Sequence, residues 1–192
     1  LLLFLNASVI LAYTSPGKPQ GFVNDFADIL TPQVEQDLEA KLEQIKLGSS
    51  NEIAVVTIDS LADETIETYA VKLFEEWGIG KKDKDNGLLF LVSIEDRKLR
   101  VEVGYGLEPY VSDSEADSVI RNIITPEFKK GDYYTGVNKG VDALVGLTDG
   151  SYTAESETPN LKINFEFVIF IFFVLFSLLG STKSWWLGGV LG

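Results

Sequence analysis

The stretch from Trp77 to Asp113 constrains the fold most, because it contains two strand-like runs joined by a short polar turn. Residues 88–94 are almost entirely apolar, and residues 99–103 alternate between apolar and charged side chains. The four residues between them, 95–98, are all charged. Two such runs with a polar connection are typical of a β-hairpin, so we expect antiparallel strands here.

A hairpin also fixes where its flanking loops lie. The loop before the first strand, 81–86, and the loop after the second, 104–113, must meet at the same end of an antiparallel pair. Glycines in and beside these loops allow close backbone approach: Gly87, Gly104 and Gly106. We call these two loops the rim. Its oxygen-bearing side chains are Asp83, Asp85, Asn86, Glu108 and Asp113. Oxygen ligands of this kind suit calcium.

The rest of the central region alternates between helical and strand patterns. Thr31-Pro32 begins a helix that continues to Gly48, and residues 53–58 form a β-branched run typical of a strand buried on both faces. Asp63 is the expected cap of a second helix that ends near Trp77. Two more helices are expected, one after a capping box at Ser112 and Glu115 with a break or kink before Pro126, the other after Gly131-Asp132. The predicted class is α/β, a small mixed sheet sandwiched between helices.

The composition narrows the chemistry. The chain contains no histidine and no cysteine, so a bound metal would be a hard, oxygen-preferring cation such as calcium or magnesium. Its formal net charge is −13, which disfavours nucleic acid as a partner and favours cations or basic protein surfaces.

Apolar segments flank this acidic domain and predict a membrane protein. Residues 1–20 resemble the apolar part of an export signal with an incomplete start, since the chain has no methionine. Residues 21–147 form the domain, and 148–162 read as a linker. Residues 163–180 are long and apolar enough for one transmembrane helix, and 185–192 begin a second membrane segment or a glycine-rich tail. Lys183 in the turn between them places the domain on the extracytoplasmic side of the plasma membrane.

Ordinary structural roles compete with ligand roles at each rim position. Asp85-Asn86-Gly87 is also a common turn sequence, and Ser112, Asp113 and Glu115 are also a common helix start. Neither acidic cluster completes an EF-hand loop. Gly87 falls at the fifth position of the first cluster, Ser118 replaces the required glycine of the second, and both lack the terminal glutamate.

Five linked motifs resemble the TPM-domain family, and the resemblance covers Gly21 to Gly146. They are Val23–Thr31, Glu52–Thr57, Phe74–Gly80, Asp85–Leu89 and Val103–Glu108, followed in order by Asp113, Phe128, Gly131-Asp132-Tyr133 and Gly136. The order of an export signal, this domain and membrane segments resembles the bacterial membrane-anchored branch. The resemblance implies a sheet between helices, cation binding in loops at one end, and a proposed phosphatase activity in some members. The residues it carries over as metal ligands are Asp85, Asn86, Glu108 and Asp113. Asp25 matches a motif too, but nothing in the sequence fixes its distance from the rim.

Two functions follow. The first is a non-catalytic extracytoplasmic module that binds a divalent cation, calcium or magnesium, and docks envelope proteins. The second is a metal-dependent phosphoester hydrolase resembling an acid phosphatase, with catalytic residues that the sequence does not identify. Arg97, Lys98 and Arg100 could bind phosphate, yet they lie at the hairpin turn and are expected to form a solvated face. A third reading, an aromatic ligand surface of Trp77, Tyr105 and Tyr110, is weaker because Trp77 continues the core stripe of its helix.

Overall fold

The computed structural model describes residues 13–153, which belong to one compact unit. The predicted membrane segments, 163–180 and 185–192, and most of the predicted export signal lie outside the described residues. No helix within 13–153 is both long and apolar enough to cross a membrane. In chain order the elements are β1 (Val23–Asp25), α1 (Pro32–Ser49), β2 (Glu52–Ile58), α2 (Ile66–Trp77), β3 (Gly87–Ser93), β4 (Lys98–Val103), α3 (Asp113–Val119), the π-helix η1 (Ile120–Ile124), α4 (Thr125–Phe128) and α5 (Tyr133–Asp149).

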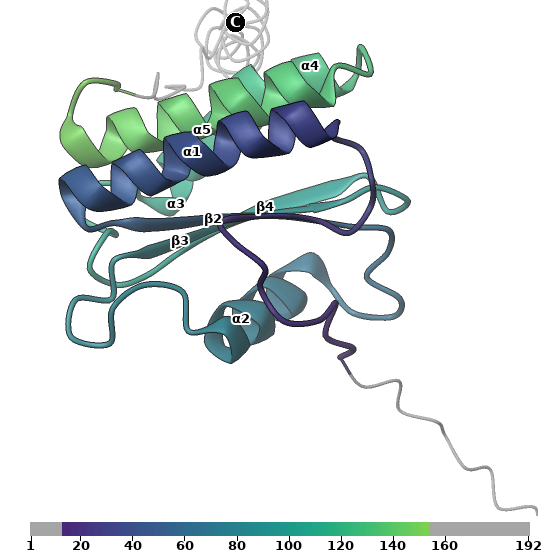
Figure 1. The fold of residues 1–192 in the computed structure, drawn as a ribbon, viewed down its shortest axis with the longest axis horizontal. Helices are drawn as coiled ribbons and strands as arrows, with labels where there is room; N and C mark the ends of the chain where they lie inside the picture. The colour runs from purple at the N-terminus through teal and green to yellow at the C-terminus, as the bar shows by residue number, and fades with distance from the viewer. Residues whose placement is uncertain (1–12, 154–192) are drawn as a thin grey trace, which may run out of the picture. The chain divides into compact units, whose positions relative to one another are not determined.

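The four strands form one mixed sheet in the order β1-β2-β3-β4. β1, β2 and β3 are parallel, and β4 returns antiparallel to β3 as the predicted hairpin. The sheet therefore has two different ends. At the amino edge β2 and β3 begin and β4 ends; at the carboxyl edge β1, β2 and β3 end and the hairpin turns. In Figure 1 the amino edge lies on the left and the carboxyl edge on the right.

Helices cover both faces of the sheet (Figure 1). β3 is buried along its whole length and β2 from its second residue onward, as expected for inner strands between two layers. Alternate side chains enter two separate cores. One core holds Ile53, Val55, Leu88 and Phe90 against α1, α3 and α5. The other holds Ala54, Val56, Leu89 and Leu91 against α2.

The two β-α-β crossovers have opposite handedness. β1, β2 and β3 follow one another in one direction across the sheet, but α1 belongs to one core and α2 to the other. Two crossovers that step the same way over opposite faces must differ in hand. Because right-handed crossovers are strongly preferred, one of these two has the rare hand.

Three of the predicted helix starts are confirmed and one is wrong. Thr31 caps α1, Ser112 and Glu115 form the capping box of α3, and Asp132 caps α5. Asp63 does not cap α2. The cap is Thr65, whose side chain accepts a hydrogen bond from the Thr68 backbone N–H at 3.2 Å. A turn closed by Glu64 N–H donating to Leu61 O occupies the preceding residues, so the helix begins later than the sequence indicated.

The break expected before Pro126 takes the form of a π-helix. η1 continues α3 without a gap, and Thr125 N–H donates to Ile120 O, five residues back. Proline lacks an N–H and its ring crowds the preceding turn, so a wider turn accommodates it. On the facing helix, Gly136 and Gly140 lie so close to Phe128 and Ile124 that a Cβ at either position would clash.

Two further features differ from the sequence expectations. β1 was not predicted, although it pairs with β2 over three residues. At the other end of the domain, α5 continues to Asp149, past the expected start of the linker. Residues 13–17 also pack on the domain, since Tyr13 Oη donates to Glu76 and Trp77 Nε1 donates to Gly17 O.

Candidate functional site

The two rim loops are joined directly through their backbones at the amino edge. Gly104 N–H donates to Gly87 O at 2.9 Å, and Gly106 N–H donates to Asp85 O at 3.0 Å. A Cβ on Gly104 would collide with Asp85 O, and one on Gly106 would collide with Lys84 O. The predicted meeting of the loops is therefore confirmed, and glycine is required at both positions.

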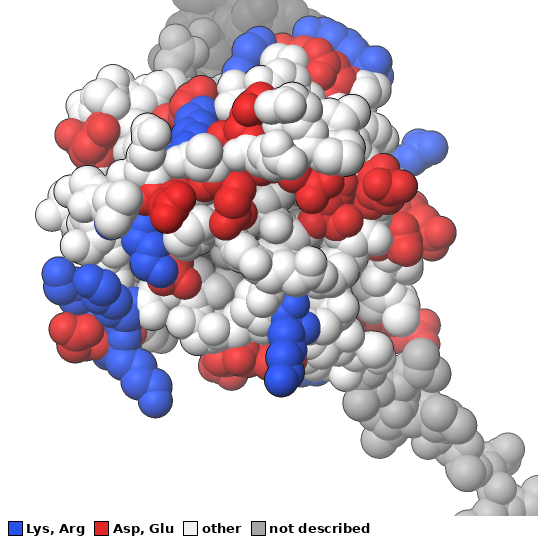
Figure 2. All heavy atoms as spheres, viewed as in Figure 1, with Lys and Arg blue, Asp and Glu red and all other residues white. Residues whose placement is uncertain are grey.

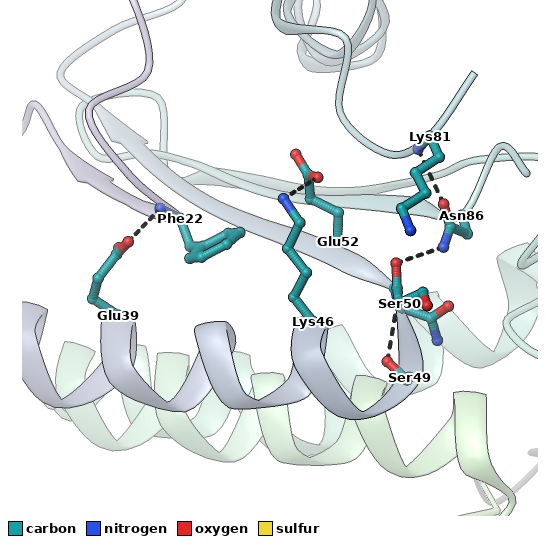
Figure 3. A network of polar contacts seen from close by, with 9 residues as sticks. Phe22, Glu39, Lys46, Ser49, Ser50, Glu52, Lys81 and Asn86 are labelled. Atoms are coloured by element: carbon teal, nitrogen blue, oxygen red, sulfur yellow. Dashed lines mark hydrogen bonds and ion pairs between the residues drawn. The ribbon is translucent and has the colours of Figure 1, made fainter. Parts of the chain in front are cut away.

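Asn86 holds the first of these loops to the end of α1 (Figure 3). Its side chain is 6% exposed. Oδ1 accepts from the Lys81 backbone N–H at 3.0 Å, and Nδ2 donates to Ser50 O at 2.6 Å. Both polar groups of the Asn86 side chain therefore form hydrogen bonds with backbone groups, and these bonds hold the 81–86 loop in place.

Nearby, an ion pair between Lys46 Nζ and Glu52 at 2.7 Å also links α1 to β2 (Figure 3). The partly buried backbone at the start of β1 is held to the same helix, because Glu39 accepts from Phe22 N–H and Val23 N–H. These contacts hold α1 to β2 and to the start of β1, behind the rim.

The three carboxylates predicted as ligands are exposed. Asp85 has a left-handed backbone with φ of 46°, and its carbonyl serves the loop contact. Glu108 lies on a turn closed by Val111 N–H donating to Leu107 O, and Asp113 is the first residue of α3. Within residues 13–153, no side-chain hydrogen bond or ion pair engages the carboxylates of Asp85, Glu108 or Asp113.

These carboxylates fit a hard cation in chemistry but do not form a ready-made cluster. Within 13–153 there is no group of three or more acidic side chains close enough to hold a metal ion. The first rim loop also carries Lys81, Lys82 and Lys84, and Figure 2 shows blue spheres at the corner where Figure 1 draws that loop. A cation here would need main-chain carbonyls or water to complete its shell.

Two exposed tyrosines are the other prominent feature of the rim. Tyr105 is 78% exposed and Tyr110 is 55% exposed, and both lie on the loop that follows β4. Trp77 is not part of this group, because it packs at the edge of the α2 core and its ring meets Phe26 edge-on. The expected core role of Trp77 is confirmed.

Asp25 lies at the opposite end of the sheet. It pairs in register with Thr57 near the end of β2, whereas Gly87 pairs with Glu52 at its beginning. At about 3.3 Å per residue this separates the two positions by roughly 17 Å. One carboxylate oxygen of Asp25 accepts from Leu30 N–H at 2.7 Å and the other from the Thr57 hydroxyl. Asp25 therefore organises the β1–α1 loop and is not part of the rim.

Comparison with known proteins agrees with this fold. A sequence model described as the TPM domain matches residues 23–147. The solution structure of the N-terminal domain of a protein from P. gingivalis is similar with a TM-score of 0.63 and 35% identity, over 68% of this chain and 83% of that one. The BA42 protein from Bizionia argentinensis gives a TM-score of 0.56 at 22% identity, over 67% and 87% of the two chains. The N-terminal domain of cg2496 from Corynebacterium glutamicum gives 0.53 at 19% identity, over 79% and 93%. No curated protein sequence matches the chain.

Proposed function

Because this chain belongs to the TPM-domain family, we propose that its domain is a non-catalytic docking module of the cell envelope whose rim binds a divalent cation, calcium first. In this proposal the apolar segment 163–180 anchors the module in the plasma membrane, with the domain on the extracytoplasmic side. The proposal for the membrane segment rests on its length and composition.

The observation that carries the docking role is the interlocked rim. Its two loops are held by backbone hydrogen bonds, so Tyr105 and Tyr110 are presented from a rigid support. Tyrosine is enriched among the residues that contribute most to protein interfaces. A rigid support lowers the entropy cost of binding, which favours a partner that docks on these rings.

The cation role is assigned to Asp85, Glu108 and Asp113, with Asn86 as the residue that positions their loop. The exposure of the three carboxylates and the lysines around them favour a weak site, in the range of about 10⁻⁴–10⁻³ M that is usual for extracellular calcium modules. Such a site would respond to extracellular calcium and would help orient the two loops toward a partner.

A metal-dependent phosphoester hydrolase is the second candidate, and the geometry supports it less. A hydrolase of that kind needs metal ligands and phosphate-binding cations around one phosphoryl group. Arg97 and Lys98 lie at the carboxyl edge, separated from the rim by the length of β3, which is about 20 Å for a strand of this size. One substrate group cannot reach both.

The thermal midpoint of the domain with and without calcium tests the cation role. A ligand that binds only the folded state at ten times its Kd stabilises by about 1.4 kcal/mol, so calcium should raise the midpoint. The double change Asp85→Asn and Glu108→Gln should remove that rise. Asp63→Asn, an exposed carboxylate at the carboxyl edge, is the matched control and should keep it. A rise that survives the double change would place the calcium site elsewhere.

A further inference from the structure

Four positively charged side chains line a hollow at the carboxyl edge. The hollow has a volume of about 630 Å³ and lies between the hairpin tip and the segment that joins α4 to α5. Figure 1 draws that hairpin tip and α4 at the same end of the domain. Its walls include Arg97 and Lys98 from the hairpin and Lys129 and Lys130 from the end of α4. We call it the basic hollow.

Three of these four cations form no close ion pair with an acidic side chain in the described part of the chain. Within residues 13–153, Arg97, Lys98 and Lys129 form no ion pair, whereas Lys130 pairs with Glu127 at 2.8 Å. Glu127 also pairs with Lys139 at 2.8 Å, so each of its two carboxylate oxygens already contacts a lysine. No aspartate or glutamate is among the described residues that line the hollow. Three cations that form no close ion pair with a described residue therefore line one concavity of a chain whose net charge is −13, and Lys98 also interacts electrostatically with the carboxylates of Asp96 and Glu67.

The structure holds this arrangement in place. Asp96 at the hairpin tip accepts from Ser93 Oγ at 2.6 Å and from Leu61 N–H at 2.7 Å, which ties the turn to the neighbouring loop. Arg97 takes a left-handed backbone with φ of 52° and donates its N–H to Ile94 O. On the other wall the Phe128 ring packs on Gly136 and meets Tyr133 edge-on at 5.1 Å.

We propose that the basic hollow binds a compact polyanion with at least two negative charges, carried by phosphoryl or carboxylate groups. Its volume falls in the range of small-molecule sites, about 300–1,000 Å³. The guanidinium of Arg97 matches the planar, two-pronged geometry of both oxyanions, and the lysines add charge without directional demand. This inference is independent of the rim and of the proposed cation site.

Calorimetric titration of the full chain with inorganic pyrophosphate, and separately with citrate, tests the proposal. Saturable binding is expected at low ionic strength. Arg97→Gln and Lys129→Gln together should weaken it about tenfold, within the roughly thirtyfold that two exposed charge pairs of up to about 1 kcal/mol each allow. Lys82→Gln removes the same charge from the rim loop and should change affinity less than about twofold. Tighter binding of pyrophosphate would assign phosphoryl groups, and tighter binding of citrate would assign carboxylates.

Failure of both anions to bind would overturn the proposal. So would equal weakening by Lys82→Gln and by the double change, because that would mean a general charge effect. Amide shifts on pyrophosphate addition should lie in 92–99 and 125–133, and shifts confined to 81–86 would also contradict the site. The rim change Asp85→Asn should leave pyrophosphate binding intact, so failure of the cation site and failure of the hollow are distinguishable.

Discussion

Asn86 shows how much of the rim depends on a single side chain. Its side-chain amide joins two parts of the chain, the start of its own loop at Lys81 and the turn after α1 at Ser50. The sequence identified Asn86 as an oxygen-bearing rim residue. It could not identify the partner on Ser50, because that residue lies 36 positions earlier and only the parallel pairing of β2 with β3 brings it near.

Replacement of Asn86 by alanine should destabilise the domain strongly. Two partly buried hydrogen bonds are lost and the Lys81 N–H and Ser50 O are left without them, so the expected cost is about 2–4 kcal/mol. Urea unfolding followed by circular dichroism measures it. Asn51→Ala, on the neighbouring turn, should cost less than about 0.5 kcal/mol. Equal effects of the two changes would contradict the positioning role.

Glu127 allows the pH dependence of the domain's stability to be tested at a single residue. Hydrogen bonds from Lys130 and then Lys139 lower the pKa of Glu127 from its ordinary 4.5 to about 2. A lowered pKa in the folded state means that the stabilisation is present above pH 4.5 and is lost as the pH falls through about 2. Glu127→Gln should therefore be less stable than the parent at pH 7.

The difference in unfolding free energy between the parent and Glu127→Gln should shrink across that acid window. Lys139→Gln, which removes one of the two donors, should show a smaller difference that shrinks in the same direction. Urea midpoints at a series of pH values provide the measurement. A difference that stays constant from pH 7 to pH 2 would show that the two lysines do not act on this carboxylate.

At the scale of elements, the start of α2 shows which of two candidate residues caps the helix. Both Asp63 and Thr65 are good capping residues, and the periodic apolar stripe alone could not choose between them. Thr65 is the cap because residues 61–64 form a turn before the helix. That turn buries the Leu61 side chain, which is 2% exposed, so the helix begins only after it. Thr65→Ala should cost about 1 kcal/mol and Asp63→Ala less than about 0.5, measured by thermal or urea unfolding. A larger cost for Asp63→Ala than for Thr65→Ala would identify Asp63 as the cap.

Substitution by alanine should have opposite effects on stability at two glycines, Gly106 in the interlocked loops and Gly48 near the end of α1. Gly106→Ala places a Cβ against the Lys84 carbonyl and should cost about 1–3 kcal/mol, since neither backbone can move without breaking the loop contact. Gly48 near the end of α1 has open space around it, so Gly48→Ala should stabilise by up to about 1 kcal/mol. Differential scanning calorimetry of both variants decides this. A neutral Gly106→Ala would mean that the rim loops are not tightly joined.

Element types were predictable where the pattern was long, and much less so where it was short. The hairpin, α1, α5 and the capping box of α3 follow from periodicity and local signals. β1 has only three residues, too few to establish an alternating pattern, and it is a strand because β2 offers it an open edge. The opposite hands of the two crossovers were not predictable either, since handedness is a property of packing and the expected hand is the common one.

For the whole molecule, the two ends of the sheet carry different chemistry. The amino edge carries the interlocked rim with its exposed tyrosines and mixed charges, and the carboxyl edge carries Asp25 and the basic hollow. The hairpin argument predicted the rim correctly, because antiparallel pairing alone places those loops together. It overlooked the hollow, because Lys129 and Lys130 come some 30 residues after Arg97 and Lys98, and only the folded chain places the two pairs around the same hollow. The composition could not reveal this either, because the net acidity of the chain hides a local excess of positive charge.

A calcium titration of residues 13–153, followed by amide chemical shifts residue by residue, tests the central claim most directly. The account predicts saturable shifts confined to 81–87 and 104–115, with a Kd of about 10⁻⁴–10⁻³ M and their loss in the double change Asp85→Asn and Glu108→Gln. Absence of saturable shifts up to about 10 mM calcium, or shifts that centre on other residues, would contradict the cation-binding rim.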